Sequence, residues 1–308
     1  VEGLEVAGTG ETVVMAARFA AHGAALGPGS SPVVRMDQPA GPWYCEHVTR
    51  IAADLRRAGP AARRRELVRV REYVFRFDYG AFWMGRPMAL RSPHTRLSPA
   101  TLALFLASAP CLRFALGWAY STRRLFKLLH RAPREVVAER MVVMDCYIPA
   151  AAAAAFVRRA RAAVPVSTPL WLCPVLGRPG PGRPVQVVSP HGHHAGLMIN
   201  VGIYGRVCDG KGREHSRFLE ALVAEHGGRK MLYSQNFYTD DEFWGRAAAG
   251  PPWTGPAMYD AEAYGALRAS YGAGALPDLF AKVCDAARPP PSDGLAARLA
   301  RAVARMVL

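Results

Sequence analysis

Three polar side chains near the end of an apolar segment are the first candidates for chemistry in this sequence. Tyr233, Asn236 and Tyr238 belong to the segment MLYSQNFY, which we expect to form a strand over Met231–Tyr238. A phenol or an amide at the tip of an apolar strand is well placed to donate a proton or a hydrogen bond to a bound molecule. We therefore take the three as candidate catalytic residues. The alternative is that they are hydrogen-bonded residues at the edge of a sheet.

A charged pair stands in a second apolar segment. The alternation over Glu72–Phe77 predicts a strand, and Arg76 and Asp78 are two residues apart, so they share one face of it. A guanidinium that is oriented by a carboxylate is suited to bind a cofactor. The pair is a candidate cofactor site, and a structural ion pair at a strand end is the alternative.

An aromatic and a thiol share a face of another predicted strand. Trp171 and Cys173 lie two apart in PLWLCPVL, over Pro169–Leu176. They are candidates for lining a flat apolar substrate, with a place in the core as the alternative. We do not expect Cys173 to be a nucleophile, because no base is near it in sequence and an apolar strand raises the pKa of a thiol.

Histidines invite the hypothesis of a metal site, which we do not favour. His191, His193 and His194 lie in a Gly/Pro-rich loop without a cysteine or an acidic ligand at suitable spacing. The six cysteines contain no CxxC pair, and several lie in apolar runs, as is typical of reduced cysteines. We expect no metal and a reducing compartment.

The elements that must position these residues follow a recognisable order. Apolar runs predict strands over 141–148, 169–176, 195–204 and 231–238, and helical patterns cover 150–164 and 213–226. This β-α-β-β-α-β order predicts an α+β fold, with ferredoxin-like split βαβ units forming an antiparallel sheet and both helices on one face. Residues 1–80 predict β-β-α-β, a second such unit without its first strand and helix.

We expect one long domain over 1–288, followed by a linker and a C-terminal amphipathic helix over 289–308. Its predicted parts are the truncated half-unit 1–85, a helical insert that bridges the halves over 97–130, the unit 140–238 and a helical end over 239–288. We also expect the absent pieces of the first half-unit to lie upstream of Val1.

The composition argues against two classes of protein. The net charge is +15, but 35 of the 39 basic residues are arginines spread along an Ala-, Gly- and Pro-rich chain. We interpret this as compositional bias and expect no nucleic-acid partner. No apolar stretch reaches the 18 or so residues of a membrane span.

Several longer segments carry a resemblance to a known family. TPLWLCPVL, INVGIYG, KMLYSQNFYTDDEFW and YGALRASYGAGALPDLFAKVCDAAR resemble, in order and spacing, the C-terminal part of the delta(24)-sterol reductases. VEGLEV, REYVFRFDYGAFWMG and LRFALGW do so as well. The resemblance covers roughly Val1 to Arg288. It includes departures from the animal pattern, in which the positions of Phe77 and Tyr79 are basic and Phe237 is a tyrosine.

The resemblance implies a flavoprotein of the vanillyl-alcohol oxidase/p-cresol methylhydroxylase type. In that family an N-terminal half binds FAD, while the C-terminal half caps the flavin and holds the substrate. The chain is then the cap part of an FAD-dependent oxidoreductase that reduces an alkene of a sterol-like or other apolar substrate by hydride transfer via FAD. NADPH is the expected reductant. Trp83, in REYVFRFDYGAFWMG, joins Trp171 and Cys173 as a candidate substrate-binding residue.

Two further expectations concern partners. The apolar stripe and flanking arginines of the C-terminal helix suit either docking on the domain or contact with an anionic membrane surface. We expect an intracellular protein, cytoplasmic or membrane-associated, at the endoplasmic reticulum if the source is eukaryotic. The alternative function is a non-catalytic ferredoxin-like domain that binds nucleic acid or a protein.

Overall fold

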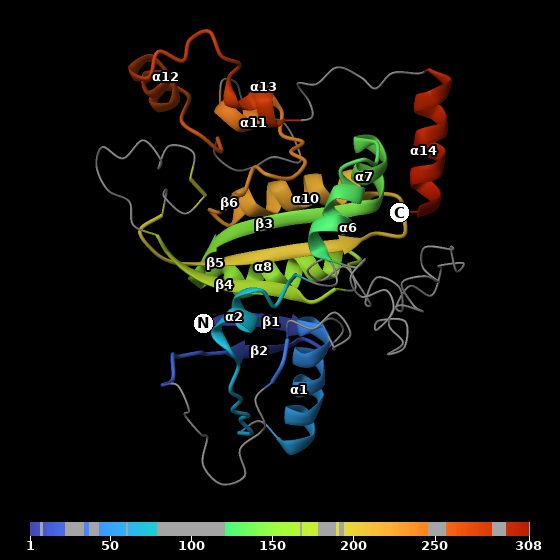
Figure 1. The fold of residues 1–308 in the computed structure, drawn as a ribbon. Helices are drawn as coiled ribbons and strands as arrows, with labels where there is room; N and C mark the ends of the chain where they lie inside the picture. The colour runs from blue at the N-terminus through green and yellow to red at the C-terminus, as the bar shows by residue number, and fades with distance from the viewer. Residues whose placement is uncertain are drawn as a thin grey trace.

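A six-stranded sheet lies at the centre of the residues that the structure, a computed structural model, describes (Figure 1). Its strand order is β2-β1-β4-β5-β3-β6, and every neighbouring pair is antiparallel. The described residues are 1–6, 9–21, 34–36, 43–59, 61–78, 121–166, 168–177, 189–190, 194–245, 257–284 and 294–307.

The predicted β-α-β-β-α-β order is present in the structure, and the α+β class is confirmed. In chain order its elements are β3 (Met141–Pro149), α8 (Ala150–Ala163), β4 (Leu170–Gly177), β5 (Gly196–Arg206), α10 (Gly212–Glu225) and β6 (Arg229–Lys230). The first five agree with the predicted ranges to within a few residues, because apolar alternation and the alanine-rich helix are strong local signals.

The first two strands predicted for residues 1–80 are present and form an N-terminal hairpin. β1 (Glu2–Val6) pairs with β2 (Glu11–Met15), and β1 pairs on its other side with β4. The hairpin therefore continues the main sheet.

The main core lies on one face of this sheet. Val142, Met144 and Ile148 alternate along β3 and pack with Phe156 of α8 and Leu219 of α10, all of them buried. Both helices therefore cover the same face, as the sequence predicted.

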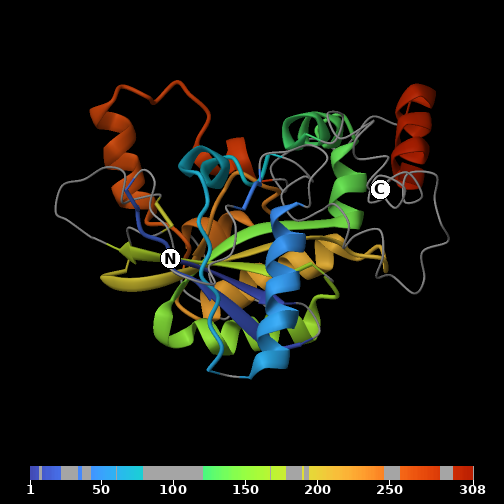
Figure 2. The same cartoon turned by 60° about the horizontal axis from the view of Figure 1, so that its bottom comes forward.

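A smaller cluster covers part of the other face. α1 (Tyr44–Ala58) places Tyr44 and Val48 against Leu4 of β1 and Tyr204 of β5. Figure 2 shows α1 in front of the hairpin. Beyond α1, the same face carries side chains that are only partly buried, Asp145, Tyr147 and Cys173 among them.

Two predicted strands are wrong. Glu72–Phe77 is not a strand, because α2 (Val70–Val74) and a turn through Asp78 occupy this segment. Tyr73 and Arg76 contact the same residue, Glu2, from positions three apart, which a helical turn permits and a strand does not. The prediction over Met231–Tyr238 fails too, since β6 covers only Arg229–Lys230 and the chain then leaves the sheet.

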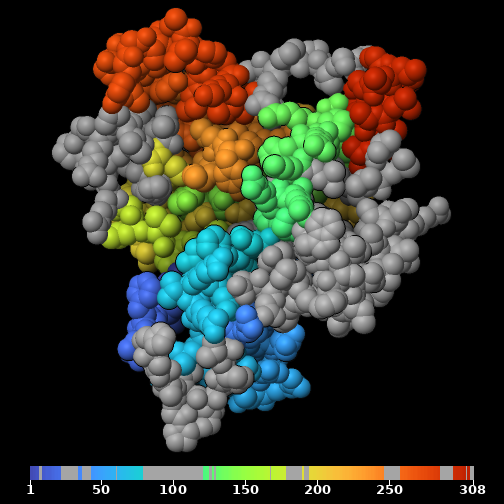
Figure 3. All heavy atoms as spheres, in the orientation of Figure 1, coloured from blue at the N-terminus to red at the C-terminus, as the bar shows by residue number. Residues whose placement is uncertain are grey.

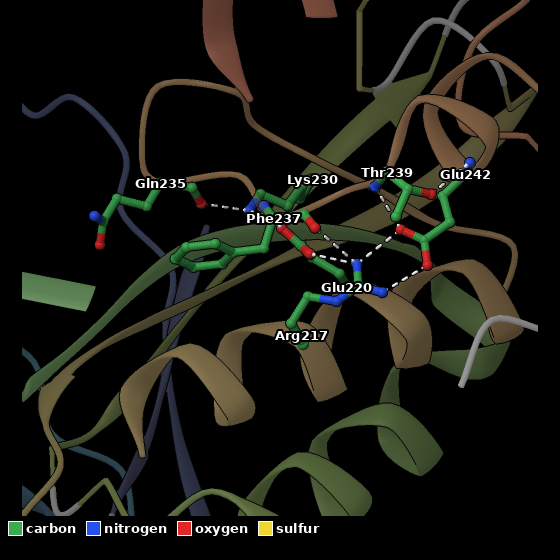
Figure 4. A network of polar contacts seen from close by, with 7 residues as sticks. All are labelled: Arg217, Glu220, Lys230, Gln235, Phe237, Thr239 and Glu242. Carbon is green, nitrogen blue, oxygen red and sulfur yellow. Dashed lines mark hydrogen bonds and ion pairs between the residues drawn. The ribbon is translucent and has the colours of Figure 1, made fainter. Parts of the chain in front are cut away.

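Buried charges fix the segment that follows β6 (Figure 4). Lys230 Nζ lies 2.9 Å from Glu220 Oε1 with both side chains fully buried, and it also donates to the carbonyl of Gln235 at 2.9 Å. Glu220 Oε1 accepts from the backbone N–H of Phe237 at 2.9 Å. Arg217 donates to Glu242 and to the Phe237 carbonyl. These long-range bonds, rather than a ladder of strand hydrogen bonds, decide the course of this loop.

Helices complete the described chain. They are α6 (Thr122–Leu129), α7 (Arg134–Arg140), α11 (Asp240–Trp244), α12 (Ala261–Ser270), α13 (Leu279–Val283) and α14 (Leu295–Val307). Only α6 represents the predicted helical bridge over 97–130, because residues 79–120 are outside the described ranges. Within the described part of the chain, no helix is both long and apolar enough to cross a membrane.

The C-terminal helix docks on α7. Arg301 pairs with Glu135 at 3.3 Å, Arg305 pairs with Glu139 at 2.8 Å, and Ala304 is buried. Figure 3 shows α14 beside the green helices. Docking, one of the two expectations for this helix, is therefore present, and contact with a membrane stays a prediction.

The buried Lys230–Glu220 pair yields a stability prediction. Lys230→Met leaves the Glu220 charge buried without its cation, and we expect a loss of about 3–5 kcal/mol in the free energy of unfolding by urea. Adding Glu220→Gln removes that charge while keeping an acceptor for Phe237, so the double variant should recover part of the loss. Lys211→Met, at an exposed lysine, is the control and should stay within about 0.5 kcal/mol. A Lys230→Met loss no larger than the control's would contradict this assignment.

Candidate functional site

The side of the sheet opposite α8 and α10 holds most of the polar side chains that are suited to chemistry. We call this side the open face. Strand register places Trp171 opposite Gly202, and Cys173 opposite Asn200. Asp145 lies opposite Gly202 on its other side. Since directly paired residues point to the same side of a sheet, these side chains form one surface.

A buried carboxylate stands at one end of the open face. Glu2 Oε1 accepts from the hydroxyls of Tyr44 at 2.7 Å and Tyr73 at 2.9 Å. Its Oε2 accepts from Arg76 at 2.9 Å and from the indole N–H of Trp171 at 3.0 Å. Burial alone would raise the pKa of Glu2, but these hydrogen bonds and the Arg76 charge outweigh it and hold the pKa below its usual value. The carboxylate thus joins β1, α1, α2 and β4.

Arg76 is enclosed by this cluster. Its guanidinium lies 4.0 Å from the ring centre of Tyr73, 4.5 Å from that of Phe77 and 5.3 Å from that of Tyr44. Its ion-pair partner is Glu2 and not Asp78, which was the predicted partner. With a carboxylate and three rings around it, Arg76 serves the packing of α2 on the sheet.

A second carboxylate stands further along the open face. Asp145 accepts from the hydroxyl of Tyr204, from the hydroxyl of Tyr233 at 2.8 Å and from the amide of Asn200 at 3.1 Å. Tyr204 and Asn200 come from β5, whereas Tyr233 comes from the loop after β6. Burial and the nearby Asp145 charge raise the pKa of Tyr233, so its phenol is neutral at physiological pH.

Gly202 makes room for this arrangement. A Cβ built on it would lie 2.6 Å from the ring of Tyr204 and 3.1 Å from Asp145 Oδ1. Any larger residue at position 202 would therefore displace the ring of Tyr204 and break its hydrogen bond to Asp145.

Cys173 lies between the two carboxylates. It is a free, half-buried thiol. Burial and the charges of Glu2 and Asp145 raise its pKa to about 11, so it is protonated at physiological pH. The thiol therefore acts as a small apolar group on the open face, as the sequence led us to expect.

The structure brings together some predicted site residues and separates others. Trp171, Cys173 and Tyr233 share the open face, and Arg76 lies at its edge through Glu2. Asn236 is buried and donates to the carbonyls of Leu232, Ser234 and Val283, so it fixes the loop and has no place on the face.

Tyr238 and Asp78 also lie apart from this surface. Tyr238 is fully buried in the main core, where its ring packs against Phe243. The backbone carbonyl of Asp78 accepts from the N–H of Thr122, which ties the end of α2 to α6. Trp83 lies outside the described residues.

The histidine loop is described only in part. His194 is described, whereas His191 and His193 are not. Among the residues that are described, no group of three His, Cys, Asp or Glu side chains is placed to hold a metal ion.

The reasoning from sequence missed four residues of this surface: Glu2, Asp145, Asn200 and Tyr204. Two of them carried a usable signal. Asp145 is the single charge within the apolar strand MVVMDCYI, and Glu2 is a charge in the short strand EGLEV. A charge within a strand that otherwise reads as core is a candidate for a buried network.

The sequence of the chain is similar to those of known proteins. The chain is 27% identical over 252 residues to the delta(24)-sterol reductases of Homo sapiens and Macaca fascicularis, and 26% identical to that of Rattus norvegicus. Each match covers 80% of this chain and 42% of the relative, so the chain spans about two fifths of the relatives' length. No family model and no solved structure matches the chain. The resemblance predicted from the sequence is confirmed at this level.

The Glu2 cluster yields a pH-dependent prediction. Glu2→Gln leaves Arg76 without its counter-charge, and we expect it to lower the free energy of unfolding at pH 7 by about 3 kcal/mol. The pKa of Glu2 is lower in the folded protein, so its stabilisation is present above the unfolded pKa and is lost as pH falls through the folded value. Urea unfolding should therefore show the gap between wild type and Glu2→Gln narrowing from neutral to acidic pH.

The exposed residue Glu214 supplies the control for that series. Glu214→Gln should change stability little at any pH. A gap for Glu2→Gln that stays constant as the pH is lowered would show that the charge of Glu2 is not what stabilises the cluster.

Proposed function

Proceeding from the similarity to delta(24)-sterol reductases, we propose that this chain is the substrate-covering part of an FAD-dependent oxidoreductase. In this proposal the enzyme reduces a carbon–carbon double bond of a sterol-like or other apolar substrate, with NADPH as the reductant. The observation that carries the proposal is the open face, an aromatic and weakly polar surface with a carboxylate and two phenols at one end. A flat apolar molecule fits such a surface.

The residues of the open face fit the ring of a flavin better than its phosphates. Trp171, Cys173 and Tyr147 offer aromatic and apolar contacts, and Asn200 adds a buried polar atom. Arg76, which the sequence suggested as a cofactor ligand, is already bound by Glu2 and surrounded by rings. We therefore propose that this chain contacts the ring of the flavin and that its phosphates are held elsewhere.

The chemistry divides between the cofactor and these side chains. When bound and reduced by NADPH, the flavin would supply the hydride for one carbon of the double bond. The other carbon requires a proton, and we assign its delivery to Tyr233, whose side chain is exposed while its hydroxyl contacts Asp145. A free tyrosinate beside Asp145 is disfavoured. The hydroxyl would therefore be reprotonated from solvent, which reaches the exposed side chain, as it gives up its own proton, while Asp145 orients it as a hydrogen-bond acceptor.

The remaining residues of the open face orient the reacting side chains and exclude water. Gly202 and Asn200 keep Tyr204 and Asp145 in place, and Trp171 is held by its hydrogen bond to Glu2. A side chain that is fixed in this way needs no reorganisation when the substrate arrives. The aromatic surface also excludes water from the double bond.

We also propose that the enzyme is intracellular and contacts a membrane surface. An intracellular location suits a reductase that uses NADPH, and contact with a membrane surface suits an apolar substrate. On α14, the arginines Arg301 and Arg305 are occupied by α7, but Leu295 and Leu299 are exposed and available for such a contact.

Tyr233→Phe tests the proposal directly. In the flavin-bound enzyme we expect kcat to fall by about a hundredfold, the range seen for loss of a general acid, with little change in melting temperature. Tyr271→Phe, at an exposed tyrosine away from the open face, is the matched control and should keep full activity. If Tyr233→Phe retains wild-type kcat, Tyr233 is not the proton donor.

A further inference from the structure

One buried acceptor on the open face has no hydrogen-bond donor. Oδ1 of Asn200 is buried without a partner, and the side chain is only 5% exposed. A buried acceptor without a donor is unfavourable in a folded protein, because it has lost its water and gained nothing in exchange. Such an atom within a surface suited to bind a ligand points to a group that the ligand supplies.

The orientation of the amide is fixed by its neighbour. Asn200 Nδ2 donates to Asp145 Oδ1 at 3.1 Å. An ionised carboxylate only accepts hydrogen bonds, so the amide must turn its NH₂ toward Asp145 and its oxygen away from it. The free end of the side chain is therefore an acceptor and not a donor.

The surroundings narrow the class of ligand. The cross-strand neighbours of Asn200 are Cys173 on β4 and Tyr147 on β3, both half-buried. Asp145 is surrounded by three uncharged donors, and no Lys, Arg or His of the described chain forms an ion pair with it. An anionic group placed beside Asn200 would meet this charge without a cation to offset it.

We propose that Asn200 Oδ1 accepts a hydrogen bond from an uncharged N–H or O–H group on a flat, largely apolar ring compound bound to the open face. This deepens the proposed function and rests on it for the position of the ligand. The donor has two sources in that setting, the imide N–H of a flavin ring or the hydroxyl of a sterol-like substrate. Asp145 acts as a positioning residue, because it holds the amide in the orientation that presents its oxygen.

Two pairs of probes test the donor and separate its sources. Calorimetric titration of the chain compares riboflavin with its N3-methyl analogue, which lacks only the imide N–H. A second titration compares cholesterol with its 3-methyl ether, which lacks only the hydroxyl donor. We expect one pair to differ by at least about tenfold in Kd, because the methylated probe leaves the buried acceptor unsatisfied.

Two variants connect that difference to Asn200. Asn200→Leu removes the acceptor, so the methylated and unmethylated probes should bind within about threefold of each other. Asp145→Asn keeps the shape of the site but frees the Asn200 amide to rotate, so it should reduce the discrimination between the probes. It provides the test where Asn200→Leu does not fold. Tyr271→Phe is the control and should discriminate as the wild type does.

Each outcome decides the proposal. Discrimination by the riboflavin pair alone assigns the donor to the flavin ring, and discrimination by the cholesterol pair alone assigns it to the substrate. The proposal is overturned if neither pair binds, if both members of each pair bind equally, or if discrimination survives in both Asn200→Leu and Asp145→Asn. Because these are binding ratios, reductase activity that depends on Tyr233 would still support the proposed function in that event.

Discussion

The buried carboxylate of Glu2 is the interaction on which the open face depends. Its four donors come from α1, α2, the turn after α2 and β4, and they are separated from it by 42, 71, 74 and 169 positions in the chain. A carboxylate that is nearly removed from water is tolerable only when it is surrounded by such donors. The requirement fixes α2 against the N-terminal hairpin and orients the indole of Trp171, which lines the face.

The two carboxylates of this face differ in how their charge is balanced. Glu2 has Arg76 as a direct partner and is enclosed with it among aromatic rings. Asp145 is contacted by two phenols and an amide, which are all neutral. The first arrangement is a structural one, because the ion pair is closed to further ligands. The second orients the hydroxyl of the exposed Tyr233, which suits the proposed proton delivery.

The sequence predicted the elements whose signal is local. The alternation of MVVMDCYI, the alanine run after it and the apolar spacing of α10 each determine one element with little help from distant residues. The prediction failed where distant contacts decide. The aromatic alternation around Phe75 is typical of a strand, but Tyr73 of α2 and Arg76 of the following turn both bond to Glu2. The segment after Lys230 has strand-like composition, yet its backbone bonds to the buried Glu220 and Arg217.

The difference between local signals and distant contacts also explains which residues of the candidate site were predicted. Trp171, Cys173 and Tyr233 were recognised because each has an unusual side chain in an apolar segment. Their connection through Glu2, Asp145 and Gly202 could not be predicted from the sequence, because strand register and the contacts of a single glycine depend on the tertiary structure. In the sequence, Asn236 and Tyr238 are polar residues of the same apolar segment as Tyr233. Their side chains point into the interior because the loop leaves the sheet after β6.

We propose that the open face, rather than the helical side, meets the flavin ring and the substrate. Cysteine alkylation tests it most directly, since Cys173 lies on that face and the exposed Cys208 follows the end of β5. Iodoacetamide labelling at about pH 9, followed by mass spectrometry, gives both rates in one sample. We expect saturating riboflavin to slow the labelling of Cys173 several-fold and to leave the labelling of Cys208 unchanged. Equal rates at Cys173 with and without bound riboflavin would contradict it.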